Sequence, residues 1–227
     1  MTSTRRDDRA KVLAATDRNI RHAAEIVLAG GVIVAPSDTN MALTLDAWNE
    51  AAVRRAFAIK RRPATSPLTL FMRAPDDWRT YTEVPDADRP IVQALAASLW
   101  PGPLNIVLPR DPQRVPDFIV CGGSTVALGV LSNPTVQRLL DFIGRPVAMT
   151  SANLSGQANG VLVDVAMARD QIGDAVDLIL EGGGQGTTAS STIVKVENGR
   201  LTILRQGDIQ PQTICDVLAG LPVELGF

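Results

Sequence analysis

The hydrophobic residues of this chain follow a helical period in some segments and form short continuous runs in others. From Asp17, a predicted N-cap, apolar residues recur every three or four positions until Gly30 and Gly31, which predicts an amphipathic helix with a glycine stop. The apolar face of this helix is predicted to contain Ile20, Ala24, Val27 and Leu28. The next run, GVIVAP at 31–36, is rich in β-branched residues and ends at a proline, which is typical of a buried strand.

The same two patterns alternate along the rest of the chain. Asn198-Gly199 is a strong signal for the tight turn of a hairpin. Helices that alternate with strands, together with one hairpin, predict an α/β fold: a twisted mixed parallel and antiparallel sheet flanked by helices. Further helices are predicted at 49–60, 86–99, 134–144, 163–171 and 211–219, and further strands at 67–72, 105–109, 125–131, 145–151, 177–182 and, as the hairpin, 191–205.

No internal repeat, low-complexity linker or shift of composition divides the sequence. Residues 17–227 are therefore expected to form a single domain, preceded by a flexible N-terminal tail of residues 1–16. The N-terminus is polar, and no apolar run approaches the roughly 18–20 residues that span a bilayer. We therefore expect a cytoplasmic protein with no membrane partner.

The charges are balanced. The 227 residues include 22 Lys and Arg against 24 Asp and Glu, for a net charge of −2, and 45% of the residues are hydrophobic. Counterion release requires a basic surface, so this balance argues against a protein held to RNA by bulk charge. A small ligand that carries phosphates remains possible, because it requires only a local cluster of cations.

Several chemistries are disfavoured by the residues that are present. Cys121 and Cys215 lie far apart without CxxC spacing, and both are interpreted as ordinary thiols. His22 is the single histidine and has no nearby partner, which argues against a Ser-His-Asp mechanism and against a transition-metal centre. There is no P-loop motif, and the glycine-rich segment at 181–186 is interpreted first as a flexible connection and second as a phosphate cradle.

Polar and cationic residues gather where strands end and loops begin, the usual place for sites on α/β sheets. Lys60 and Arg62 flank a turn, where two donors can hold phosphate oxygens. Ser151, Asn153 and Ser155 follow a strand and offer short donors and acceptors, and Arg205 adds a cation from the hairpin. Taken singly, the cations could complement a helix end and the Ser and Asn side chains could cap the loop. Together they favour a site.

These segments resemble the YrdC/Sua5 family of threonylcarbamoyl-adenylate synthases. TSANLSG at 150–156 matches the family's T-S-A-N-x-S-G, and WPGPL at 100–104 and KRRP at 60–63 match its W-P-G-P-L and K-x-R-P motifs. PSDTNMAL at 36–43 is similar to P-T-D-T-x-Y-G-L, and Ser191, Thr192 and Arg205 are in register with the S-T and R-x-G elements. The resemblance runs from about residue 17 to residue 210. The additional C-terminal domain of longer family members is not expected here.

The resemblance implies a reaction. L-threonine and bicarbonate, as CO2, form N-carboxy-threonine, whose carboxylate attacks the α-phosphate of ATP and releases pyrophosphate. The product, threonylcarbamoyl-AMP, serves the t6A modification of tRNA, so a downstream carbamoyl-transferring enzyme is an expected partner. Such a nucleotidyltransferase depends on positioning, on cations and on Mg²⁺ carried by the phosphates, rather than on a general base.

The resemblance also implies roles for particular residues. Lys60 and Arg62 are expected to be catalytic, and no protein metal ligand is expected. The nucleotide-binding residues are expected to be Ser151, Asn153, Ser155, Ser191 and Arg205, and the substrate-binding residues Ser37, Thr39, Met41, Thr125 and Thr150.

The sequence departs from the family pattern within the expected site. Met41 and Ala42 replace a Tyr and a Gly, Ser66 replaces a basic residue or His, Gly129 replaces an Arg, and Asn105 replaces a Thr. Contacts to charged groups contribute about 1.5–3 kcal/mol each, so two lost cations would weaken the binding of triphosphate substantially.

Arg61 or Arg73 could substitute for the lost cations, or the protein could act on a different amine in a specialised pathway. A non-catalytic nucleotide- or RNA-binding module is the third hypothesis, and the net charge of −2 argues against its RNA form.

Overall fold

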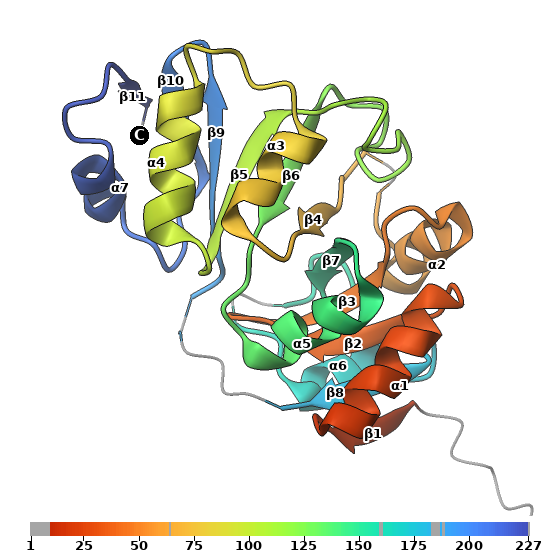
Figure 1. Ribbon diagram of the computed structural model, residues 1–227. Coiled ribbons are helices and arrows are strands. Elements are labelled where there is room, and N and C mark those ends of the chain that lie inside the picture. The colour runs from red at the N-terminus through yellow and green to blue at the C-terminus, as the bar shows by residue number, and fades with distance from the viewer. Residues whose placement is uncertain (1–9, 64, 159–160, 183–186, 188, 227) are drawn as a thin grey trace, which may run out of the picture.

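The computed structural model describes residues 10–63, 65–158, 161–182, 187 and 189–226. In these residues eleven strands form one sheet, in the order β1-β8-β2-β3-β7-β4-β6-β5-β9-β10-β11 (Figure 1). The strands are β1 (Lys11–Ala14), β2 (Val32–Pro36), β3 (Met41–Asp46), β4 (Thr69–Phe71), β5 (Leu104–Pro109), β6 (Thr125–Gly129), β7 (Val147–Ser151), β8 (Leu178–Glu181), β9 (Thr192–Glu197), β10 (Arg200–Arg205) and β11 (Glu224–Gly226).

Parallel and antiparallel pairs are mixed within the sheet. The pairs β1–β8, β2–β8, β4–β6, β5–β9 and β10–β11 are parallel, whereas β2–β3, β3–β7, β4–β7, β5–β6 and β9–β10 are antiparallel. The predicted mixed sheet is confirmed. The helices are α1 (Asp17–Leu28), α2 (Glu50–Lys60), α3 (Trp78–Tyr81), α4 (Arg89–Leu99), α5 (Pro134–Ile143), α6 (Val165–Ile172) and α7 (Pro211–Val217), with a 3-10 turn at Pro75–Asp77.

Helices cover both faces of the sheet, as β2 shows. Val32 and Val34 belong to one hydrophobic cluster, while Ile33 and Ala35, which point the opposite way, belong to another. The second cluster includes the apolar faces of α1 and α5, which lie side by side in Figure 1. A strand that is buried on both faces has no polar alternation, which explains why the sequence shows β2 as a continuous apolar run.

The N-terminal segment corrects one expectation. Lys11–Ala14 forms β1, which pairs with β8 at the edge of the sheet, although residues 1–16 were expected to be a flexible tail. The strand forms because Val12 and Leu13 pack against the two hydrophobic clusters on opposite faces. Thr16, not Asp17, caps α1 by accepting a hydrogen bond from the Asn19 backbone N–H. Residues 1–9 lie outside the described residues.

Three other differences are local. β3 was missed because its first three residues were assigned to the motif at 36–43, yet all six residues of the strand are buried between β2 and β7. β11 was also missed. Leu28 was placed on the buried face of α1 but is 45% exposed. None of the helices in the described part of the chain is long and apolar enough to cross a membrane.

The hairpin turn between β9 and β10 is confirmed and is anchored from outside. Asn198 and Gly199 both have positive φ, 55° and 74°, as the tightest hairpin turns require. Their backbone N–H groups donate to the carboxylate of Asp88, at 3.0 and 2.6 Å. Asp88 precedes α4 and is 2% exposed, so this carboxylate fixes the hairpin to the helix that covers it.

We expect Asp88→Ala to lower the free energy of unfolding by about 3 kcal/mol, because two buried backbone donors lose a charged acceptor. Asp86→Ala is the matched control: its side chain is 90% exposed and pairs with Arg89 at the surface. That change should cost less than about 0.5 kcal/mol. Urea denaturation of both variants would measure the difference, and equal stabilities would contradict the anchoring role of Asp88.

Candidate functional site

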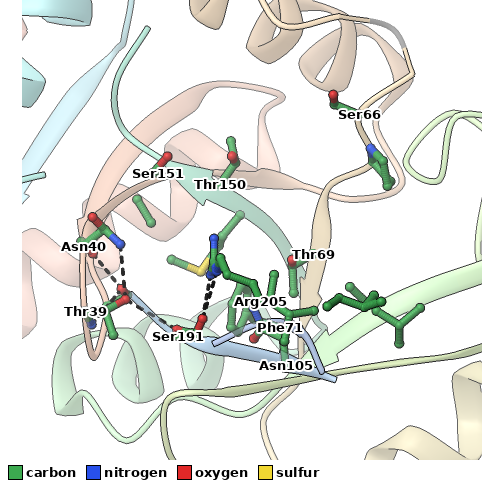
Figure 2. Close-up of a pocket in the computed structure, with 18 of the residues that line it drawn as sticks. Thr39, Asn40, Ser66, Thr69, Phe71, Asn105, Thr150, Ser151, Ser191 and Arg205 are labelled. Atoms are coloured by element: carbon green, nitrogen blue, oxygen red, sulfur yellow. Dashed lines mark hydrogen bonds between the residues drawn. The ribbon is translucent and has the colours of Figure 1, made fainter. Parts of the chain in front are cut away.

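A pocket of about 490 Å³ lies on one face of the sheet, with loops around its rim (Figure 2). Its floor is built from side chains on six strands, β3, β4, β5, β6, β7 and β9: Ala42, Thr69, Phe71, Asn105, Val107, Ala127, Met149 and Ile193. Its rim consists of Ser37, Thr39, Asn40, Arg62, Thr65, Ser66, Pro67, Leu131, Thr150, Ser151, Ser191, Leu204 and Arg205.

The register of the strands brings the floor residues together. Phe71, Gly129 and Asn105 are direct neighbours on β4, β6 and β5, so their side-chain positions share one face. Thr69 and Ala127 form the equivalent pair two residues earlier. Alternate positions on these strands therefore line the pocket, while the intervening positions, such as Leu70 and Leu128, are buried in the core.

The turn after β2 is held by a buried carboxylate. Asp38 accepts hydrogen bonds from the backbone N–H groups of Ser132 and Asn133, at 2.9 and 2.7 Å, just before α5. Within the turn, the Ser37 hydroxyl donates to the Asn40 carbonyl at 2.6 Å. The turn is thus fixed both to itself and to the start of a helix.

A chain of hydrogen bonds connects this turn to the C-terminal hairpin (Figure 2). The Thr39 and Ser191 hydroxyls lie 3.4 Å apart, and the Asn40 amide donates to the Thr39 hydroxyl at 3.3 Å. Arg205 donates through Nε and Nη2 to the Ser191 carbonyl, at 3.1 and 2.7 Å. One side of the pocket is therefore built from two segments that lie about 150 residues apart in the sequence.

Lys60 forms the other anchor of the site, from a buried position. Its ammonium group donates to the carbonyls of Ser151 and Asn153, the latter at 2.6 Å, and the Ser155 backbone N–H donates back to the Lys60 carbonyl at 2.9 Å. Lys60 is 1% exposed. Burial, and secondarily the charge of Arg62, lower the pKa of Lys60 to about 7.

Arg62 extends from the residue after the helix cap and lines the pocket directly. Its guanidinium donates to the carbonyls of Ser66 and Pro67, at 2.8 and 2.9 Å, and reaches the Thr150 hydroxyl at 3.5 Å. Burial lowers the pKa of Arg62, an effect that the nearby Cys121 thiol partly opposes. These bonds fix the plane of the guanidinium group at the rim of the pocket.

The loop after β7 is held together by its own side chains. The Ser151 hydroxyl donates to the Asn153 side-chain oxygen at 2.6 Å, and the Asn153 amide donates to the Leu154 carbonyl at 2.7 Å. The Ser155 hydroxyl oxygen is buried, and no hydrogen-bond partner is found for it among the described residues. Ser151 lines the pocket, whereas Asn153 shapes the loop from beneath.

The structure therefore divides the residues predicted from sequence into two groups. The first group lines the pocket: Ser37, Thr39, Arg62, Thr150, Ser151, Ser191 and Arg205. The second group is not among the described residues that line the pocket: Lys60, Asn153, Ser155, Met41 and Thr125. Lys60 was expected to hold phosphate oxygens from a turn, but its ammonium group is directed at backbone carbonyls instead.

Most floor residues were not predicted from the sequence. Thr69, Phe71 and Met149 line the floor and Asn40 the rim, and Asn105 was noted only as a departure from a motif. Side chains alternate between the two faces of a strand, so every second residue of each strand was a candidate for the floor. Which set of alternate residues faces the pocket could be decided only from the register between the strands.

The structure also shows what surrounds Gly129, one of the positions that depart from the family pattern. A Cβ added at Gly129 would lie 2.7 Å from Phe71 Cε1 and 2.7 Å from Asn105 Oδ1, so a larger side chain has no room there. Arg61 and Arg73 are not among the residues that line the pocket, and Arg73 pairs with Asp141. They do not take the place of the missing cations in this arrangement. Among the described residues, no group of three or more His, Cys, Asp or Glu side chains could hold a metal ion.

The fold and the site define an α/β protein with an arginine- and hydroxyl-lined pocket on the face of a mixed sheet. Residues 25–207 match the sequence model of the Sua5/YciO/YrdC family, which carries the description "Telomere recombination". This match covers most of the chain, and the chain belongs to the Sua5/YciO/YrdC family.

Individual relatives agree with this assignment. The chain is similar to the threonylcarbamoyl-AMP synthase of Marinobacter nauticus, with 32% identity over 179 residues that cover 78% of this chain and 91% of that protein. It is similar to the crystal structure of P. abyssi Sua5 complexed with L-threonine, with a TM-score of 0.85 and 26% identity over 95% of this chain, but it spans only 62% of that chain. It is also similar to E. coli YciO, with a TM-score of 0.78, 26% identity, and coverage of 90% of this chain and 99% of that one.

We expect Lys60→Met to lower the free energy of unfolding by about 3 kcal/mol, because the change leaves the carbonyls of the loop after β7 without their buried donor. Arg54→Met on the same helix is the matched control, since Arg54 is 78% exposed and pairs with Glu50. It should change stability by less than about 0.5 kcal/mol. Thermal denaturation would compare the two. A Lys60→Met variant as stable as the control, with weakened nucleotide binding, would instead assign Lys60 a direct contact with the ligand.

Proposed function

We propose that this chain is an enzyme of the threonylcarbamoyl-AMP synthase type, which forms a carbamoyl-adenylate from ATP, bicarbonate and L-threonine. The observation that carries the proposal is the chemistry of the pocket lining. Two guanidinium groups, those of Arg62 and Arg205, border the pocket together with several hydroxyl groups, and the described lining includes no carboxylate. Such a lining suits an anionic ligand rich in oxygen atoms, which a nucleotide triphosphate is.

The relatives support the same activity. The protein from Marinobacter nauticus is named a threonylcarbamoyl-AMP synthase, and the P. abyssi structure is described as a complex with L-threonine. The specificity of the matched motifs and the extent of the shared fold favour an enzyme over a non-catalytic binding module. Within this proposal the enzyme is a nucleotidyltransferase.

The chemistry requires positioning more than proton transfer. The neutral amino group of threonine adds to CO2 and releases a proton to water. A carboxylate oxygen of the resulting N-carboxy-threonine then attacks the α-phosphorus of ATP, and the bond from that phosphorus to pyrophosphate breaks as pyrophosphate leaves. In our proposal Arg62 and Arg205 stabilise the negative charge that develops on the phosphate oxygens, and Ser151, Thr150 and Ser191 orient the substrates by hydrogen bonds. Each of these five side chains lines the pocket.

Lys60 has a different part in this scheme. It holds the carbonyls of Ser151 and Asn153 and so positions the loop that presents the Ser151 hydroxyl to the pocket. We therefore reassign Lys60, Asn153 and Ser155 from direct contact with substrate to support of the loop that makes that contact. Such supporting interactions determine how accurately contacting groups are placed.

Mg²⁺ accompanies ATP in this proposal as a counter-ion of the phosphates. The pocket lining that the structure describes offers hydroxyl groups and arginines but no carboxylate, which is the ligand that a protein normally supplies to Mg²⁺. The residues therefore do not form a metal site of their own, and none of their roles depends on one.

A second substrate is favoured by one observation. The family pattern has an arginine at the position of Gly129 and a threonine at the position of Asn105. Here Phe71 and Asn105 occupy the space beside Gly129, so the floor of this pocket carries less charge than the pattern implies. A carbamoyl-adenylate enzyme that acts on another amine would fit such a floor. The other parts of the proposal, a cytoplasmic enzyme that supplies t6A modification of tRNA through a downstream carbamoyl-transferring enzyme, depend on threonine as the amine.

We expect the protein to release pyrophosphate from ATP only when both bicarbonate and an amine are present, because the attacking carboxylate is made from those two substrates. A coupled pyrophosphate assay, with mass spectrometry of the products from a panel of amino acids, tests this. Threonylcarbamoyl-AMP as the main product supports threonine, and a different carbamoyl-adenylate supports the second substrate. Pyrophosphate release that is indifferent to bicarbonate would contradict the proposed chemistry.

We expect Arg205→Met to weaken ATP binding by at least about tenfold, because a hydrogen-bonded cation at a phosphate contributes about 1.5–3 kcal/mol. Arg200→Met is the matched control on the same strand: Arg200 pairs with Glu224 and does not belong to the pocket lining. Isothermal titration calorimetry with ATP compares both variants with the wild type. Equal losses of affinity in the two variants would show that net charge, rather than the position of Arg205, controls binding.

A further inference from the structure

One buried asparagine differs from the others in the described part of the chain. Asn105, Asn133 and Asn153 are all at least nine-tenths buried, with 6%, 4% and 4% of their surface exposed. The Asn133 side chain accepts from the Thr135 N–H and the Asn153 side chain bonds to Ser151 and Leu154. Within the described residues, the Asn105 side chain makes no hydrogen bond, and its amide atoms are not among the fully buried side-chain atoms that lack a partner, so the amide is accessible from the pocket that Asn105 lines.

The unpartnered amide lies at the floor of the pocket. Asn105 is on β5, between Gly129 of β6 and Ile193 of β9, and it is one of the residues that line the pocket. Its immediate surroundings are apolar, with the Phe71 ring on the far side of Gly129 and Val107 two residues along the strand. The amide therefore has both its donor and its acceptor available to a bound molecule.

Gly129 makes this arrangement possible. A Cβ at position 129 would lie 2.7 Å from Asn105 Oδ1 and 2.7 Å from the Phe71 ring, closer than such atoms can approach. Any side chain at position 129 would therefore displace the amide, the ring or both. The glycine, the ring and the amide form one unit, in which the small residue allows the other two to occupy the floor.

We propose that Asn105 is a specificity-determining residue whose amide binds a neutral hydrogen-bonding group of the substrate at the pocket floor. The group is neutral because Phe71, Val107 and Ile193 supply no counter-charge, and an unpaired charge is costly in such surroundings. The nearest cation along this row of the sheet, Arg205, lies two strands away, beyond Ile193, and the proposed function assigns it to the phosphate groups. The choice of ligands rests on the proposed function. Under that function, the group is the hydroxyl of threonine or the hydrogen-bonding edge of adenine.

Two variants at this position separate hydrogen bonding from shape. Asn105→Thr and Asn105→Val have side chains of nearly the same volume, both β-branched and suited to a strand, and they differ in one hydroxyl group. We expect the valine variant to bind the relevant ligand about tenfold more weakly than the threonine variant. Calorimetry with ATP and with L-threonine measures each ligand separately, and thermal denaturation checks that both variants fold.

Analogues that lack one polar group identify the source of the contact. If Asn105 binds the threonine hydroxyl, the wild type prefers threonine to valine, and the Asn105→Val variant loses that preference while its ATP affinity is unchanged. If Asn105 binds the base, the wild type prefers ATP to the triphosphate of unsubstituted purine, and Asn105→Val loses that preference instead. Either result supports the proposal and assigns the ligand.

Equal affinities of the two variants for both ligands would overturn the proposal. So would a wild-type protein that does not distinguish either ligand from its analogue, a measurement that requires no variant to fold. Pyrophosphate release by the wild type separates this failure from that of the proposed function. Normal release with no effect at position 105 rejects the role of Asn105 alone, whereas an effect of Asn105 on binding without any release rejects only the proposed reaction.

Discussion

The buried ammonium group of Lys60 is the interaction on which the arrangement of the site depends. It lies at the end of α2 and donates to carbonyls of the loop that follows β7, so it joins two segments about ninety residues apart in the sequence. Arg62 follows two residues later and Ser151 is itself one of the bonded residues. A charge that would be costly alone is stabilised by oxygen atoms on the opposite segment, and both pocket-lining side chains take their positions from that pairing.

The sheet contributes a surface rather than a set of catalytic groups. Mixed pairing allows floor side chains from six strands to face one hollow, with mostly apolar residues and the Asn105 amide at its centre and hydroxyl or guanidinium groups at its edge. The division has a physical reason, because strand interiors are buried while loops at strand ends can be solvated. This surface would bind the apolar or neutral part of a ligand at its centre and the charged part at its edge.

The regular elements were predictable from sequence because their patterns are local. The apolar run of β2, the glycine stop after α1 and the Asn198-Gly199 turn each depend on a few adjacent residues. The rim of the pocket was also predictable where a motif placed polar residues at a strand end, as at Ser151. The burial of Lys60 and the exposure of Asn105 to the pocket were not, because both depend on which distant segments pack beside them.

The contact between Thr39 and Ser191 joins residues 152 positions apart, and it has a consequence for the order of events during synthesis. The turn that carries Thr39 leaves the ribosome long before β9 and β10, which complete the opposite wall. Until those strands pair with β5, the edge of β5 is an unpaired strand edge beside an incomplete pocket. Contacts of such long range also form slowly, so the nascent protein gains its ligand site only after β9 and β10 have been synthesised.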